Sequence, residues 1–138
     1  MKRFGRVLVG TIAGLVLAGC ATLELEDVRW NLVELDGVPA VAASEQRQAF
    51  IVFESRGPLR VSGSTGCNRF AGSYTRRGSS LTLGSLATTR MACPDGMEQE
   101  RAFEQALQAV HGWRRIDGIL EMLDDQGAVR LRFEPAGS

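Results

Sequence analysis

The chain has little of what many catalytic and metal sites require. Its 138 residues include a single histidine, His111, and three cysteines. No C-x-x-C or H-x-x-x-H spacing occurs, and a zinc site needs three or four ligands, so we expect neither a metal nor a cofactor. The G-x-S-x-G elbow of serine hydrolases is also missing, because Gly63-Ser64-Thr65-Gly66 is one residue short of it.

The remaining catalytic possibilities are weak, so we predict that the protein is not an enzyme. Cys67 and His111 are a conceivable nucleophile and base, but nothing in the sequence places them together. His111 is better explained as a cation near a helix end. Four carboxylates cluster around expected turns, where acidic residues usually serve as solvated turn formers: Asp117, Glu121, Asp124 and Asp125.

The first twenty residues have the pattern of an export signal. A positive start, with Lys2, Arg3 and Arg6, precedes an apolar stretch over 7–17 that is too short to span a bilayer. The following Leu17-Ala18-Gly19-Cys20 resembles the lipobox of bacterial lipoproteins. The resemblance implies a signal peptide over 1–19 and lipidation of Cys20. A plain secretory signal with a chance cysteine is the alternative.

Lipidation predicts a location and a domain organisation. Ala21 favours the outer membrane, because retention in the inner membrane of enteric bacteria commonly uses aspartate at that position. We therefore expect a lipid-anchored protein of the bacterial cell envelope that faces the periplasm. Residues 20–26 are expected to form the lipidated N-terminus and a short tether, and 27–138 a single domain.

Loss of the leader also changes the charge and the cysteine count. The 16 basic and 16 acidic residues become 13 against 16, a net charge of −3, so nucleic acid is not an expected partner. The expected partners are the membrane, through the anchor, and an unknown envelope protein or small ligand. Cys67 and Cys93 remain as an even pair in an oxidising compartment, which favours a disulfide. Two buried thiols or a metal pair are the alternatives.

Periodicity predicts a mainly β (α+β) fold. Alternating stretches between glycine and serine turns predict strands, and two further turns at 116–119 and 124–127 frame three final strands that end with 129–133. The earlier strands are expected at 28–35, 49–54, 59–64, 69–75, 80–83 and 86–91. Apolar residues of helical spacing predict one amphipathic helix near 97–110, with Asp95 and Glu98 as a capping-box-like start.

The expected architecture is a small antiparallel β-barrel-like or strongly curved sheet with that one inserted helix. Curling the sheet removes exposed edges, and the helix is expected to plug or cover one opening of the barrel.

Two motifs are similar to those of a known family. Residues 61–74 read VSGSTGCNRFAGSY, and residues 86–93 read LATTRMAC. With Trp30-x-Leu32 and the acidic start at 97–100, they resemble the META domain, the HslJ-like family, over nearly the whole mature chain. The resemblance implies an envelope lipoprotein with a barrel-like fold, associated with heat shock and novobiocin tolerance. It implies no catalytic reaction.

The same motifs supply the candidate binding residues. Glycines and Asn68 are ordinary turn formers, which gives them a structural explanation. A sharper interpretation is that Arg69 and Arg90 flank the region tied by the cysteines and offer forked donors to an anionic ligand or a partner carboxylate.

Two function classes follow. The first is a non-enzymatic binding or stress-protection module of the META type. The second is a periplasmic inhibitor of a hydrolase that presents a rigid loop. An inhibitor should expose a polar loop such as 76–79, whereas a ligand binder should have an apolar cavity inside the barrel.

Overall fold

A computed structural model describes residues 25–137 of the chain. The signal peptide expected over 1–19 and the lipidation site Cys20 lie outside the described residues. Within residues 25–137, no helix has the length and apolar character needed to cross a membrane.

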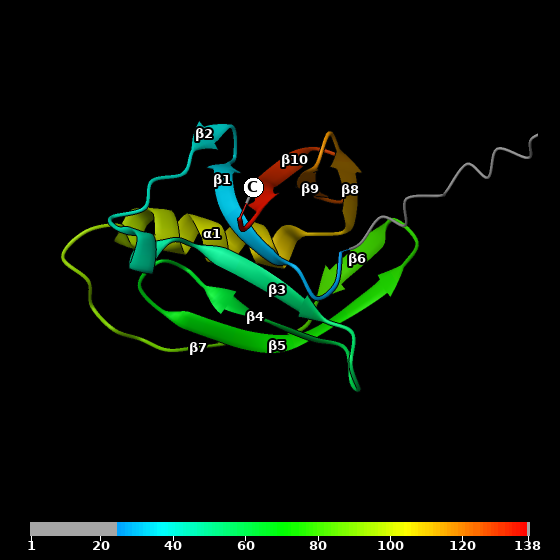
Figure 1. Cartoon of the computed structure of the whole chain (residues 1–138), viewed down its shortest axis with the longest axis horizontal. Coiled ribbons are helices and arrows are strands. Elements are labelled where there is room, and N and C mark those ends of the chain that lie inside the picture. Colours follow the sequence, from blue (N-terminus) through cyan, green and yellow to red (C-terminus); the bar gives the residue numbers. More distant parts are fainter. Residues whose placement is uncertain (1–24, 138) are drawn as a thin grey trace, which may run out of the picture.

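The described chain is a closed antiparallel barrel with one α-helix, which confirms the predicted fold class (Figure 1). Eight strands form a ring in the order β1-β3-β4-β5-β6-β8-β9-β10, and β10 pairs back with β1. β2 pairs with β1, and β7 with β5, outside this ring. The elements are β1 Arg29–Leu35, β2 Val38–Pro39, β3 Phe50–Glu54, β4 Arg60–Ser64, β5 Arg69–Arg77, β6 Ser80–Leu83, β7 Ala87–Thr88, α1 Met97–Ala109, β8 Gly112–Ile116, β9 Ile119–Leu123 and β10 Val129–Pro135.

Three local predictions need correction. Val38–Pro39, which lies between the strands predicted at 28–35 and 49–54, forms the short strand β2, because the turn at Asp36 and Gly37 folds it back onto β1. The strand predicted over 86–91 is reduced to Ala87–Thr88. The capping box is wrong: Gly96 is the N-cap residue of α1, with φ 79° and no side-chain cap, while the Asp95 carboxylate binds Arg47 instead.

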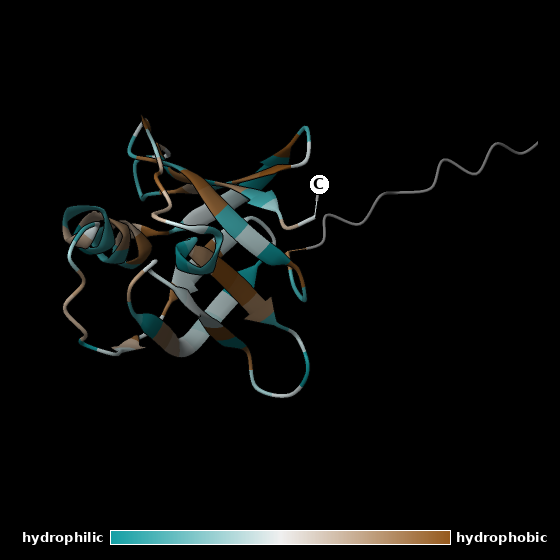
Figure 2. Ribbon diagram, turned by 60° about the vertical axis from the view of Figure 1, so that its left-hand side comes forward, coloured by the Kyte–Doolittle hydropathy of each residue, from teal (hydrophilic) through white to brown (hydrophobic). Residues whose placement is uncertain are grey.

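The core fills the inside of the ring. Alternate residues of each strand point inward, and the fully buried ones include Trp30, Phe53 and Leu131. Phe103 of α1 packs edge-on against Phe70 of β5, with ring centroids 6.0 Å apart, and lies 6.2 Å from Phe133 of β10. Because β5 and β10 are on opposite sides of the ring, the helix covers one opening of the barrel, as expected (Figure 2).

Gly63 of the first motif is required by close packing. A Cβ atom at this position would lie 2.1 Å from the Phe50 carbonyl oxygen and 2.6 Å from Cζ of Phe70. Both distances are far below van der Waals contact, so any larger residue would displace β3 or the Phe70 ring. This glycine is therefore a packing residue of β4.

The chain enters the barrel at the end opposite the start of α1 (Figure 1). Leu25 is fully buried, and its carbonyl accepts a hydrogen bond of 2.9 Å from the Trp30 indole. Glu26 forms an ion pair with Arg76. Residues 25 and 26 thus belong to the folded domain, although the sequence placed them in the tether of residues 20–26. The burial of Leu25 beside Trp30 explains the difference.

Candidate functional site

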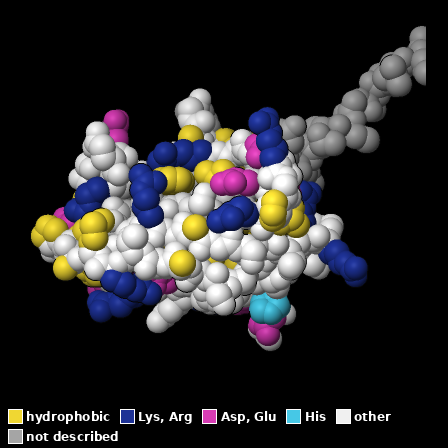
Figure 3. All heavy atoms as spheres, turned by 90° about the horizontal axis from the view of Figure 1, so that it is seen from below, with side chains coloured by type: hydrophobic (Ala, Val, Ile, Leu, Met, Phe, Trp, Pro, Cys, Tyr) yellow, Lys and Arg dark blue, Asp and Glu magenta, His cyan; other side chains and the backbone are white. Residues whose placement is uncertain are grey.

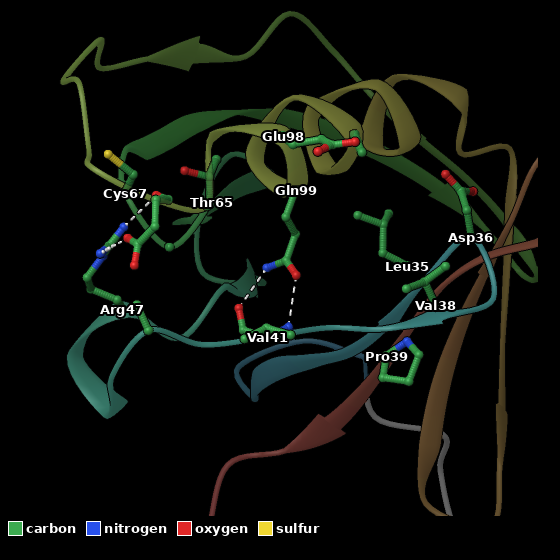
Figure 4. A pocket seen from close by; sticks show the side chains of 15 residues that line it. Leu35, Asp36, Val38, Pro39, Val41, Arg47, Thr65, Cys67, Glu98 and Gln99 are labelled. Atoms are coloured by element: carbon green, nitrogen blue, oxygen red, sulfur yellow. Dashed lines mark hydrogen bonds and ion pairs between the residues drawn. The ribbon is translucent and has the colours of Figure 1, made fainter.

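A cleft of about 570 Å³ opens beside the first turns of α1 (Figure 4). Its walls are the helix start, the β1–β2 hairpin, the loop between β2 and β3, and the turn between β4 and β5. Six apolar side chains line it: Leu35, Val38, Pro39, Val41, Ala43 and Ala102. The cleft lies outside the ring, whereas the sequence predicted that a ligand binder would have its cavity inside the barrel. Core side chains occupy that interior.

Two contacts between distant segments hold the cleft in shape. The Gln99 amide donates to the Val41 carbonyl over 3.0 Å and accepts from the Val41 N–H over 2.8 Å. Arg47 donates to the Asp95 carboxylate over 2.6 Å and to its backbone carbonyl over 3.0 Å. Both contacts connect the loop before β3 to the start of α1. The cleft is therefore preformed in the protein without a ligand.

The mouth of the cleft exposes apolar side chains. Val38 is 64% exposed and Val41 is 74% exposed, and both line the cleft. Val38 belongs to the β1–β2 hairpin and Val41 to the loop that follows it, so two adjoining walls of the cleft each expose an apolar side chain.

The predicted disulfide is confirmed and forms part of the same wall. Cys67 and Cys93 are bonded, with Cα atoms 6.2 Å apart, and Cys67 lines the cleft. The bond joins the β4–β5 turn to the segment that leads into α1. Its formation also removes the thiolate that a Cys67 nucleophile would need.

Asn68 connects three segments behind this wall. It is 1% exposed. Its Nδ2 donates to the Glu100 carboxylate over 2.6 Å and to the Met91 carbonyl over 3.2 Å. Its Oδ1 accepts from the Met91 N–H over 2.7 Å and from the Thr89 hydroxyl over 3.0 Å. Asn68 therefore ties β5, the loop before α1 and the helix together, which is more than the turn role that its sequence context indicates.

Glu100 is a buried acidic residue that the sequence did not single out. It is 2% exposed, and Oε2 of its carboxylate has no hydrogen-bond partner among the described residues. It follows the spacing of the buried helix face, three residues before Phe103 and seven before Leu107. This spacing is visible in the sequence and predicts that the Glu100 carboxylate lies among core residues.

The two candidate arginines lie on paired segments, but outside the cleft. Arg90 is already paired with Glu104 of α1, at 3.0 and 3.2 Å. Arg69 is exposed at the start of β5, and its carbonyl accepts from the Thr89 N–H over 2.9 Å. Neither arginine lines the cleft. Figure 3 shows basic side chains scattered over one face of the protein among hydrophobic and acidic side chains, without a single dense patch.

The loop proposed for an inhibitor is pinned to the barrel. The Arg76 guanidinium binds Glu26 and lies 4.7 Å above the Trp113 ring. The Trp113 indole in turn donates to the Gly78 carbonyl over 2.8 Å. The loop lies at the end where the chain enters the barrel, away from the cleft. Arg77 and Ser79 remain exposed.

Glu121 differs from the turn-forming acids with which the sequence grouped it. It lies within β9, is nearly buried, and accepts from Arg114 over 2.6 Å and from Arg132 over 2.9 Å. Burial acts to raise the pKa of this carboxyl, but the hydrogen bonds from Arg132 and Arg114 outweigh it, so the pKa is lowered. Arg132 also binds Glu34 of β1, and the ion pairs therefore cross four strands on the outer surface.

Replacing Glu121 by glutamine is expected to lower the free energy of unfolding at pH 7 by about 1 to 2 kcal/mol, because two charge-assisted hydrogen bonds weaken. The stabilisation by a carboxyl with a lowered pKa is present above its unfolded value, near 4.5, and is lost as pH falls through the folded value. Urea unfolding at pH 7 and pH 3 should therefore show the difference between wild type and Glu121→Gln shrinking in acid. Glu134→Gln, at an exposed position of β10, should show no such difference at either pH.

The described residues contain no group of three His, Cys, Asp or Glu side chains that could hold a metal ion. His111 is exposed just after α1, and its Nδ1 lies 3.0 Å from the Ala109 carbonyl. Asp124 acts as a turn former, since its carboxylate accepts the backbone N–H groups of Gln126 and Ala128 over 2.9 Å each.

Comparisons with known proteins cover almost all of the described chain. The META domain family model matches residues 23–137. A protein from Burkholderia xenovorans, solved by NMR, is 29% identical, with a TM-score of 0.64 over 83% of this chain and 85% of that one. A second NMR structure is 25% identical, with a TM-score of 0.62 over 81% and 92% of the two chains.

A third structure shares the fold alone. It is the crystal structure of a DUF4847 family protein from Bacteroides vulgatus, 14% identical, with a TM-score of 0.58 over 80% of this chain and 93% of that one. No curated protein matches the chain.

Proposed function

The chain belongs to the META domain family, and from this premise we propose that it is a lipid-anchored envelope protein that binds a small apolar ligand in the cleft beside α1, without catalysing a reaction. The observation that carries the proposal is the cleft itself. It has about 570 Å³ of space, a fixed shape and an apolar lining that is exposed to solvent. Ligand sites of proteins are usually concave and mostly apolar, with few polar groups.

The exposed valines favour an apolar ligand. Val38 and Val41 leave most of their side-chain surface in water, which is unfavourable by roughly 25 cal/mol for each Å² of apolar surface. A ligand that covers both side chains and contacts Leu35 would remove this surface from water. Only a ligand with an apolar part can contribute this favourable free energy of binding.

The rigidity of the walls favours binding as well. The Gln99–Val41 hydrogen bonds, the Cys67–Cys93 disulfide and the Asn68 contacts all fix segments that surround the cleft. A site with such walls loses less conformational entropy on binding than a flexible one would. The first family motif supplies part of this wall, since Thr65, Gly66 and Cys67 line the cleft, and the second motif is joined to it through Cys93.

Lipidation at Cys20 would place the cleft on the side away from the membrane. Residues 21–24 would then be the whole tether and could span at most about 14 Å. β1 runs from the end near Leu25 to the cleft at Leu35, and its seven residues span roughly 20 Å. The cleft would therefore open toward the periplasm, and the protein would bind its ligand close to the membrane. Protection of the envelope during stress is the role we propose for this capture.

Two serine substitutions at the cleft mouth test the proposal. We expect the wild-type protein, purified from envelope fractions, to carry a small molecule that native mass spectrometry detects. Val38→Ser combined with Val41→Ser should bind it about tenfold more weakly, because two apolar contacts are lost. Both side chains are exposed in the free protein, so the variant should keep its stability.

The matched control changes two exposed apolar residues outside the cleft, Leu59→Ser and Ile116→Ser. It should retain the ligand at the wild-type level. If both double variants retain the ligand equally, the cleft is not the ligand-binding site. Cys20→Ala tests the anchor separately, because it should abolish acylation measured by intact mass and leave the folded domain unchanged.

A further inference from the structure

The charged side chains that line the cleft differ in whether they have an ion-pair partner, and this difference indicates the charge of the ligand that the proposed function requires. Arg47 is the one basic side chain among the residues that line the cleft, and it is bound twice to Asp95. Asp36 is paired with Arg130 of β10. Among the described lining residues, Glu98 is the charged side chain that has no ion pair and no hydrogen bond.

The two ends of the cleft differ in their charged groups. Figure 4 shows Glu98, Leu35 and Asp36 toward one end, and Arg47 with Cys67 toward the other. The apolar surface of Leu35 and Val38 therefore lies beside the unpaired Glu98 and the Asp36–Arg130 ion pair. The opposite end is neutralised by the Arg47–Asp95 pair.

The other polar groups of the cleft are already engaged. The Gln99 amide uses its oxygen and its nitrogen on Val41. The Thr65 hydroxyl pairs with the backbone of Asn68. Asp95 and Glu98 flank the first turn of α1, so the partial positive charge of the helix start is offset and does not favour an anion.

From this arrangement we infer that the ligand is a cationic amphiphile, with an apolar body against Leu35, Val38 and Val41 and one amine or quaternary ammonium group beside Glu98. The inference rests on the proposed ligand-binding function of the cleft and specifies the chemistry of its ligand. Glu98 is exposed to solvent, and a positive group beside it would pair with a carboxylate that has no other partner among the described residues. A carboxylate or sulfate group at the same position would meet the unpaired Glu98 carboxylate and be repelled, whereas Asp36 is neutralised by Arg130.

Three probes of matched shape test the charge: 4-phenylbutylamine, 4-phenylbutanol and 4-phenylbutanoate. Each is titrated into the full chain in phosphatidylcholine nanodiscs, and amide NMR shifts of the cleft residues report binding. The amine should bind about two- to fivefold more tightly than the alcohol, as expected for one partly exposed charge pair, and the carboxylate more weakly than both.

Glu98→Gln should bring the amine to the affinity of the alcohol, whereas Glu134→Gln removes the same charge far from the cleft and should leave the preference intact. Two results would overturn the cationic ligand and leave the proposed function unaffected. In the first, all three probes shift the cleft resonances and bind with equal affinity; in the second, the carboxylate binds most tightly. Preference for the amine that survives Glu98→Gln would also overturn it. Absence of cleft shifts with every probe would reject both.

Discussion

Replacing Asn68 by alanine is expected to lower the free energy of unfolding by about 3 to 5 kcal/mol. The amide of Asn68 is the only hydrogen-bond partner of the Glu100 carboxylate among the described residues, at 2.6 Å. Truncation leaves that buried carboxylate without any donor and leaves the Met91 N–H without its acceptor. Equilibrium unfolding in urea measures the loss, with near-ultraviolet circular dichroism to verify that the variant folds.

Two comparisons isolate the cause. Asn31→Ala removes an exposed hydrogen bond from Arg29 and should cost less than about 0.5 kcal/mol. Glu100→Gln keeps an acceptor for Asn68 and removes the buried charge, so the Asn68→Ala change should cost less in that background. An Asn68→Ala cost that is the same in the wild-type and Glu100→Gln backgrounds would show that the carboxylate contact does not stabilise the fold.

Loss of the Cys67–Cys93 disulfide is the second large expected effect. The double variant Cys67→Ser, Cys93→Ser releases a loop whose ends are 26 residues apart in sequence. The chain-entropy model gives a loss of about 3.5 kcal/mol for a loop of this length. For a domain of this size the melting temperature should fall by about 10 to 20 °C, measured by calorimetry.

Reduction of the wild-type protein supplies the control. A reductant should lower the melting temperature of the wild type to that of the double variant and should not change the double variant further. If the reduced wild type keeps its original melting temperature, the disulfide does not contribute to stability. Alkylation followed by intact mass measurement establishes that the bond was open during the scan.

Much of the barrel was predictable because its signals are local. Alternation of apolar and polar residues marks β1 and β10, and a continuous apolar run marks β3. The change of period marks α1, which buries Phe103 and Leu107. The Asp117-Gly118 turn was also expected, and both residues have positive φ. The disulfide followed from the pairing of two cysteines once Cys20 was assigned to lipid.

The cleft was not predictable because its contacts join segments far apart in the chain. Gln99 binds Val41, 58 residues away, and Arg47 binds Asp95, 48 residues away. The second contact also explains the wrong capping box, since Asp95 has a stronger partner than the helix start. Glu100 was read as part of an acidic helix start, although its spacing to Phe103 placed it on the buried face.

The pairing of β1 with β10 has a consequence for the order of folding. Leu32 is opposite Phe133 in this pair, so the ring joins segments from the two ends of the described chain. Because the chain emerges from its N-terminal end, from the ribosome or across the membrane, β1 becomes available long before 129–135, and until then its second edge has no partner. Such distant pairing slows folding. The nascent chain is expected to stay open, with Trp30 and Leu32 accessible to chaperones, until the last strand is available.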